Sequence, residues 1–309
     1  MLTIAAAVVV IYFVNAKVYG PEHQVRSYFQ ALRDGEGERA LGLLGARVPE
    51  GNPAVLDGEA LKASAADLEV LDIAEPASAG DRKADVTVRY SIDGREEQTT
   101  FRLQRADRDW LFFDHWTFVP TALPTFTVVS PGQQEATLNG TRVALQDEAT
   151  TLTAFYPTKL DASFTTEYFA APSQTGVITS PQDTVQLTLK TAATESLVAA
   201  VDAEVREFLD GCTAGQDRLA PAGCPFFHYT DSKMDLPIVW EITAYPQVDI
   251  RPVAGDWVLA PLSGRASLSA TQTDLFSGVK SALNVEKDFS FAASLRVDGN
   301  GVSITPAVD

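Results

Sequence analysis

The chain has 309 residues, a net charge of −17 at neutral pH and 45% hydrophobic residues. This length allows two or three domains of about 100–150 residues each, and the hydrophobic share excludes wholesale disorder. The negative charge argues against nucleic-acid binding and against docking on anionic lipid headgroups.

Residues 1–18 read MLTIAAAVVVIYFVNAKV, and only Thr3 is polar before Asn15. As a helix they would span roughly 27 Å, close to a bilayer core of about 30 Å. We therefore interpret residues 1–19 as a transmembrane anchor, with the rest of the chain outside the cytoplasm at the plasma membrane. A cleaved signal peptide and a buried first helix or strand remain alternatives. The basic residues follow the segment, which by the positive-inside rule would favour a cytoplasmic body.

Residues 20–120 form the first expected domain. An apolar stripe of Val25, Tyr28, Phe29 and Leu32 predicts a helix that ends at Asp34-Gly35. A second short helix and a helical turn follow, and then the period changes to that of strands around 68–73, 86–90, 99–103 and 110–119. The last of these strands is apolar on both faces, so we expect it at the centre of the sheet.

The pattern V-x2-YF-x-ALRDG at 25–35, followed by a small helix and by strands that end in DWLFF at 109–113, resembles the ketosteroid-isomerase-like α+β cone, also called nuclear-transport-factor-like. That fold can host catalysis in a conical pocket, so Trp110, Asp114 and Trp116 are candidate pocket residues. An acid among aromatic side chains can act as a general acid or base. We expect a structural role for Asp114 instead, as an acid near the rim or bonded to a backbone N–H or an arginine.

Residues 121–190 contain short Thr- and Val-rich runs without helical period, and Asn139-Gly140 predicts a hairpin turn. We expect a β-sandwich-like module here.

Residues 191–309 return to a helix at 194–210, ending at Asp210-Gly211, and then to antiparallel strands. The phrases VREFLDG at 205–211 and GDWVL at 255–259 echo segments of the first domain. We therefore hypothesise a second, diverged α+β cone, so that the whole chain is α+β.

Cys212 and Cys224 are the two cysteines of the chain. A disulfide in an oxidising compartment is the simplest interpretation, worth about 3 kcal/mol for a ring of this size. Reduced thiols and a zinc site that adds His228 are the alternatives, although a fourth ligand is missing. We expect no metal and no cofactor.

The sequence contains no P-loop, no dinucleotide-binding fingerprint, no nucleophile elbow and no zinc-protease motif. We expect a non-catalytic, membrane-anchored envelope protein that binds a wall component or an envelope partner. A carrier of a hydrophobic molecule or lipid in a cone pocket is the alternative, and an enzyme using a cone carboxylate is a further one. The order of anchor, cone, β module and cone resembles bacterial, actinobacterial-type envelope proteins. It is distantly similar to the teicoplanin-resistance-associated membrane protein family, whose cytoplasmic zinc ribbon this chain lacks.

Overall fold

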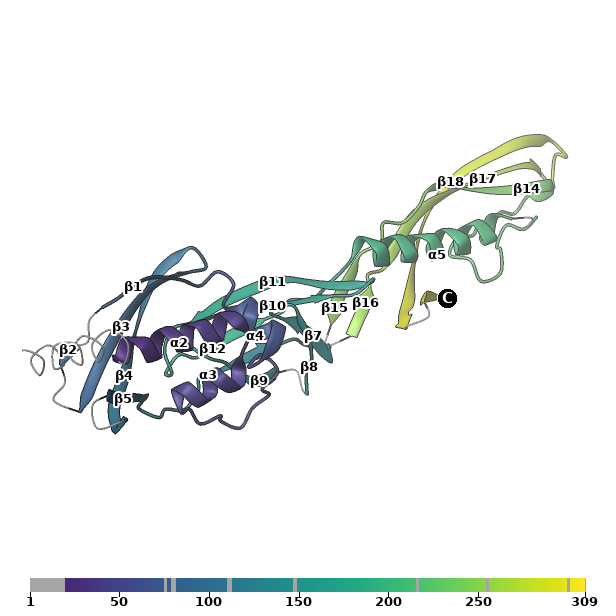
Figure 1. Ribbon diagram of the computed structural model, residues 1–309. Coiled ribbons are helices and arrows are strands. Elements are labelled where there is room, and N and C mark those ends of the chain that lie inside the picture. The colour runs from purple at the N-terminus through teal and green to yellow at the C-terminus, as the bar shows by residue number, and fades with distance from the viewer. Residues whose placement is uncertain are drawn as a thin grey trace, which may run out of the picture. The chain divides into compact units, whose positions relative to one another are not determined.

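A computed structural model describes residues 20–74, 77–78, 82–109, 113–146, 149–214, 217–253, 256–298 and 301–308 (Figure 1). The expected anchor at 1–19 therefore lies outside the described residues. None of the helices in the described ranges is both long enough and apolar enough to cross a membrane. The fold is mixed α+β with more strand than helix.

The chain divides into two compact units. Unit 1 comprises the described residues up to Thr165 together with Ala171–Thr191, so the segments expected as a first domain and a β module fall in the same unit. Unit 2 comprises Thr166–Ala170 and the described residues from Ala192 onward.

Unit 1 begins with three helices, α2 (Pro21–Asp34), α3 (Gly37–Leu44) and α4 (Gly58–Ser64). The predicted end of α2 is confirmed, because Gly35 takes the left-handed conformation with φ 75° and closes the helix. Gly37 allows a close approach, since an added Cβ there would lie 1.9 Å from the carbonyl oxygen of Leu56. The segment before α4 therefore packs directly against the start of α3, and both α3 and α4 contact α2.

The first sheet of unit 1 has the order β1-β3-β4-β5, with β2 pairing with β3. Its strands are β1 (Glu69–Ile73), β2 (Ala77–Ser78), β3 (Lys83–Ile92), β4 (Arg95–Asp109) and β5 (Phe113–Phe118). The Asp93-Gly94 turn joins β3 to β4 with positive φ at both residues, as its sequence predicts. Strand β5 is the edge of this sheet, so the prediction of a central strand was wrong. Helices α2 and α3 pack against it.

Two further sheets complete unit 1. One has the order β12-β6-β9, in which β12 (Val185–Thr188) is parallel to β6 (Thr125–Val129) and β6 is antiparallel to β9 (Ala149–Thr153). The other runs β11-β10-β7-β8 and contains β7 (Glu135–Leu138), β8 (Thr141–Ala144), β10 (Thr158–Thr165) and β11 (Phe169–Ile178). The two sheets approach each other at Gly176, where an added Cβ would lie 2.7 Å from Val185 Cγ1.

Unit 2 contains one helix, α5 (Glu195–Thr213), and a sheet of order β14-β17-β18-β19. Its long antiparallel strands are β14 (Lys233–Ala244), β17 (Leu262–Thr273), β18 (Lys280–Asp298) and β19 (Gly301–Ala307). Strands β15 (Ile250–Val253) and β16 (Asp256–Leu259) form a separate hairpin, and β13 (Ala192–Ala193) pairs with Phe169 and Ala170. Figure 1 shows α5 running along this sheet.

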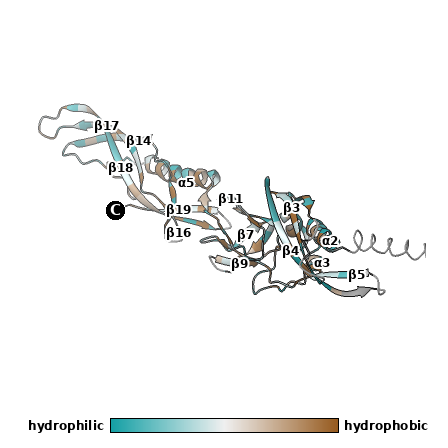
Figure 2. Cartoon of the chain, turned by 90° about the vertical axis from the view of Figure 1, so that its left-hand side faces the viewer, coloured by the Kyte–Doolittle hydropathy of each residue, from teal (hydrophilic) through white to brown (hydrophobic). Residues whose placement is uncertain are grey.

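The apolar face of α5 explains its position. Leu197, Val201, Val205, Leu209 and Cys212 recur at helical spacing and are all buried. They share one core with side chains of β14, β17 and β18, among them Trp240, Leu268 and Phe289. In Figure 2, hydrophobic and hydrophilic residues are mixed along α5. This pattern is expected of a helix with one face in the core and the other in solvent. The helix continues past Gly211 to Thr213, so the predicted end at Asp210-Gly211 was wrong.

Candidate functional site

The predicted pocket on the first sheet is described only in part. Trp110 lies outside the described residues, and Asp114 is described as a backbone position of β5 paired with Arg108. Trp116 is 9% exposed. Its ring has the Arg105 guanidinium carbon 5.2 Å from the centroid, which is a cation–π contact. Trp116 thus packs against the strand opposite it.

The space between helix α2 and the first sheet is filled by aromatic rings. Tyr28 is fully buried and contacts Phe101, Phe118 and Phe155 at centroid distances of 5.7, 5.7 and 6.3 Å. Its hydroxyl donates to the carbonyl oxygen of Tyr156 at 2.7 Å. Burial raises the pKa of Tyr28 well above its ordinary value, so this phenol stays protonated and serves as a fixed donor.

A cavity of about 440 Å³ lies beside β4, near the end of its pairing with β5. Thr99, Phe101, Tyr156 and residues 179–182 contribute to its lining. The Thr99 hydroxyl bonds Tyr90 Oη at 2.8 Å and donates to the Thr179 carbonyl oxygen at 2.6 Å. Burial raises the pKa values of Tyr90 and Tyr156 to about 12. These phenols are neutral donors and acceptors, not acids or bases that exchange protons near pH 7.

Two carboxylates lie at or beside this cavity, and both have partners. Asp85 lines the cavity and accepts a hydrogen bond from Arg102 Nε at 3.4 Å, and Asp183 lies next to it. Asp183 accepts hydrogen bonds from the backbone and hydroxyl of Thr179 and from the backbone and hydroxyl of Ser180, at 2.7–3.0 Å. Burial alone would raise the pKa of Asp183, but these four bonds outweigh it and the pKa is lowered. The carboxylate holds the 179–183 turn closed. The hydroxyl of Thr99 and the carboxylate of Asp183 therefore already have partners.

A second, larger hollow lies on unit 2, along the solvent side of α5. We call it the α5 groove; it has a volume of about 800 Å³. On the helix it is lined by residues spaced three or four apart, and across from them by the segment that follows β14. The lining residues are Ala193, Thr194, Glu195, Val198, Ala199, Asp202, Arg206, Tyr245, Pro246, Gln247 and Val248.

An arginine–tyrosine pair forms one end of the α5 groove. The Arg206 guanidinium carbon lies 4.3 Å from the centroid of the Tyr245 ring, and Arg206 Nε donates to Asp202 at 2.6 Å. The Tyr245 hydroxyl donates to the carboxylate of Asp210 in a short hydrogen bond. That bond raises the pKa of Tyr245, and the bond to Asp202 raises the pKa of Arg206. A fixed cation therefore lies between two carboxylates.

The other end of the groove is acidic and apolar. Thr194 caps α5, its hydroxyl accepting a hydrogen bond from Leu197 N at 3.3 Å. Glu195 is exposed beside the cap, and within the described part of the chain no ion pair involves it. Val198, Ala199 and Val248 supply apolar surface between the two ends. The groove can thus recognise a ligand that carries both charges along an apolar stretch.

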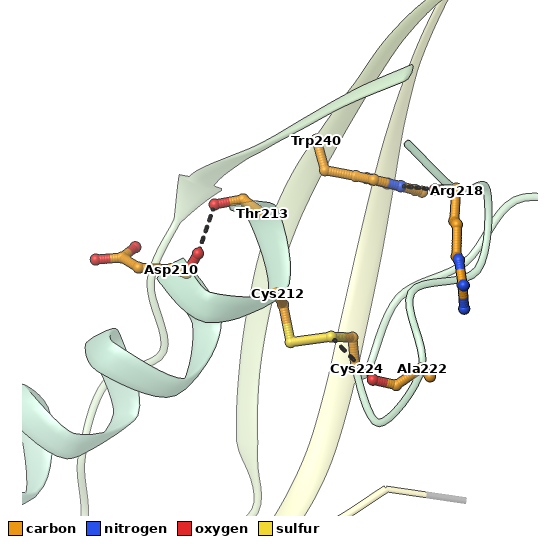
Figure 3. The surroundings of a disulfide bond; sticks show 7 residues. All are labelled: Asp210, Cys212, Thr213, Arg218, Ala222, Cys224 and Trp240. Carbon is orange, nitrogen blue, oxygen red and sulfur yellow. Dashed lines mark hydrogen bonds between the residues drawn. A yellow bond between two sulfur atoms is a disulfide. The ribbon is translucent and has the colours of Figure 1, made fainter. Parts of the chain in front are cut away.

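The predicted disulfide is present at the C-terminal end of α5, where Cys212 and Cys224 have Cα atoms 5.7 Å apart (Figure 3). Because the two sulfurs are bonded to each other, neither is a zinc ligand. Trp240 Nε1 also donates to the carbonyl oxygen of Arg218 at 3.0 Å, as Figure 3 shows. Among the described residues, no cluster of three or more histidine, cysteine, aspartate or glutamate side chains could hold a metal ion.

A comparison with protein-family models, with curated proteins and with solved structures found no match. Sequence reasoning missed the α5 groove. The helical stripe of Glu195, Asp202 and Arg206 could have been found by its spacing. Nothing in the sequence pairs Arg206 with Tyr245, because that contact depends on where the segment after β14 lies.

Proposed function

We propose that this protein is a non-catalytic binding protein of the cell envelope, and that its α5 groove receives a peptide-like segment of a wall component or of an envelope partner. The observation that carries this proposal is the position of Arg206, fixed by Tyr245 and Asp202 at one end of an open groove. Arginine recognises carboxylates with two parallel hydrogen bonds, and the exposed Glu195 suits an amino group. Peptides offer both kinds of group along one chain.

The location proposed is outside the cytoplasm, at the plasma membrane, with residues 1–19 as the anchor. The Cys212–Cys224 disulfide supports this location, because disulfides persist in oxidising compartments. In fold, we propose that unit 1 contains a ketosteroid-isomerase-like cone, which the order of three helices and then an antiparallel sheet supports. We also propose a second, diverged cone in unit 2, where one helix among the described residues, α5, packs on an antiparallel sheet. The envelope-protein resemblance is part of the same proposal.

The lack of catalysis is also a proposal. It is supported by the buried tyrosines, which stay protonated, and by the four hydrogen bonds that occupy Asp183. The carrier alternative needs an enclosed apolar cavity. Aromatic rings fill the space between α2 and the first sheet instead, which favours binding at the surface.

The test of the groove is retention of the full chain on isolated peptidoglycan, and in a second arm, photo-crosslinking from Ala199 within the envelope. We expect Arg206→Ala to lower retention or crosslinking about tenfold, equivalent to about 1.4 kcal/mol. Retention on peptidoglycan would identify a wall component as the ligand, and crosslinking to a protein would identify an envelope partner.

The matched control is Arg265→Ala. Arg265 is also exposed in unit 2 and also donates to an aspartate, Asp288, at 2.7 Å, but it lies outside the groove. Its loss removes the same charge and a similar ion pair, so binding should be unchanged. Equal effects of the two variants would mean that general electrostatic attraction, and not the groove, causes the binding. Binding in neither arm would refute the proposed function.

A further inference from the structure

The turn between β17 and β18 carries a cluster of exposed apolar side chains. Leu275 is 72% exposed, Val279 is 61% exposed, and Phe276 is fully exposed at 102%. We call residues 274–279 the hairpin tip. Apolar side chains gathered at one place on a soluble surface generally mark an interaction site, and these three stand at the end of a long hairpin (Figure 1).

Most of the backbone N–H groups of the hairpin tip are bonded within the tip itself. Asp274 N donates to the Val279 carbonyl oxygen at 3.0 Å, and Gly278 N donates to the Asp274 carbonyl oxygen at 2.9 Å. Asp274 Oδ1 accepts from Phe276 N at 3.1 Å and from the backbone and hydroxyl of Ser277 at 2.6 and 2.7 Å. In hydrocarbon an unpaired backbone group costs several kcal/mol. The bonded donors of the tip avoid this cost when Leu275, Phe276 and Val279 contact lipid.

Behind the apolar tip lie residues typical of a membrane interface. The first strand pairs place Lys233 and Lys280 on either side of Thr273, directly behind the turn. Tyr229 is 80% exposed and lies four residues before Lys233, which is at most about 14 Å of extended chain. Tyrosine and lysine concentrate at the headgroup level, where a polar end meets water and an apolar body meets lipid.

The charge around the hairpin tip is nearly balanced. Lys233 and Lys280 stand against Asp231, Asp235 and Asp274, giving a local sum of −1 (two positive, three negative) on a chain of net charge −17. Lys280 Nζ is 2.7 Å from Asp235 Oδ2. A neutral, zwitterionic lipid surface can therefore approach this part of the molecule without strong repulsion, whereas anionic lipids offer no added attraction.

We propose that the hairpin tip inserts Leu275, Phe276 and Val279 into a zwitterionic bilayer surface, with Tyr229, Lys233 and Lys280 at the headgroup level. The tip is a second membrane contact, separate from residues 1–19. A protein partner would need a pocket shaped for this projecting turn. An apolar end with tyrosine and lysine behind it in space instead matches the change in polarity across a lipid interface.

The test uses the full chain with Phe276→Trp on phosphatidylcholine vesicles whose acyl chains carry bromine, which quenches tryptophan in the hydrocarbon region. The native chain has four tryptophans, so insertion of the fifth should remove up to about one fifth of the emission beyond the loss seen in the native chain. The matched control, Ser290→Trp, places the ring on an exposed position of β18 away from the turn and should add no quenching. Replacing part of the lipid with phosphatidylglycerol should not increase the effect.

Native chain and variants share residues 1–19, so their difference reports the hairpin tip alone, whatever those residues do. Equal quenching of Phe276→Trp and the native chain would overturn the proposal. So would a photo-crosslinker at position 276 that joins one discrete protein in the envelope, because the tip would then occupy a protein pocket. Stronger quenching on phosphatidylglycerol would overturn the assignment to zwitterionic lipid.

Discussion

The two units bury their helices in different ways. In unit 1 helix α2 contributes Tyr28 and Phe29 to a cluster of aromatic rings on the first sheet, and both side chains are essentially inaccessible to solvent. In unit 2 a single helix covers one face of the sheet, and a disulfide fixes the loop that follows it. The opposite face of that sheet is polar, with Ser267, Ser269 and Arg265 pointing away from the buried Ala266 and Leu268.

The two units also differ in how many polar groups in their hollows are free to bind a ligand. The cavity next to β4 in unit 1 is lined by groups that bond one another, such as the Thr99 hydroxyl and the Thr179 carbonyl oxygen. The α5 groove in unit 2 is more open, and it contains a fixed arginine and an exposed glutamate. Both proposed contacts, the groove and the hairpin tip, lie in unit 2. We propose that unit 2 provides the binding surfaces of the protein.

Removing the disulfide is expected to change the stability of one unit relative to the other by the largest amount. Replacing Cys212 and Cys224 with serine should lower the free energy of unfolding of unit 2 by about 3 kcal/mol, because the bond closes a ring with a sequence separation of 12. Hydrogen exchange should accelerate in α5 and β14. Peptides from α2 to α4 should exchange as before.

Faster exchange throughout both units in the serine variant would contradict this separation, since the bond would then stabilise the chain as one cooperative body. The native protein treated with reductant serves as the chemical control. It should reproduce the pattern of the serine variant without any change of residue.

A smaller effect is expected in unit 1 from Asp183→Asn. The amide cannot accept all four hydrogen bonds from Thr179 and Ser180, so the free energy of unfolding should fall by about 1–2 kcal/mol. The folded state lowers the pKa of Asp183 below its ordinary value of 3.8. The carboxylate's contribution is therefore complete above that pH and is lost as the pH falls through the folded-state pKa.

Denaturant titrations of both proteins at several pH values measure this difference. It should be constant near neutrality and shrink below about pH 4. A difference that persists unchanged in strong acid would show that the asparagine acts by a route other than the lost charge. Thr99→Val is a useful companion, because it removes a neighbouring hydroxyl of the same cavity and leaves the carboxylate in place.

Local patterns predicted much of this fold, because they depend on residues close in sequence. The turns at Asp93-Gly94 and Asn139-Gly140 both have positive φ at their two residues, as those dipeptides favour. The apolar stripes of α2 and α5 also became buried faces. The cysteine pair was found by the same kind of reasoning, from spacing and type.

Features set by distant segments were not predicted. Strand β5 has an apolar sequence but lies at a sheet edge, covered by α2 and α3. Helix α5 passes Gly211 because the buried Cys212 belongs to its core face, which outweighs the cost of one helical glycine, about 1 kcal/mol. Strand β11 contains Pro172 and Gly176 and showed no strand pattern. The α5 groove was missed because Tyr245 reaches Arg206 only in the folded chain.

The most direct test of the central claim, an envelope protein with an extracytoplasmic body, is fractionation of cells treated with a membrane-impermeant thiol reagent. Cys224 is partly exposed and should be labelled in the membrane fraction only after reduction. The buried Cys212 should need denaturant as well. Protein in the soluble fraction whose Cys224 is labelled without reduction, and only after the cells are broken, would contradict the account, since the body would then be cytoplasmic and its thiols unbonded.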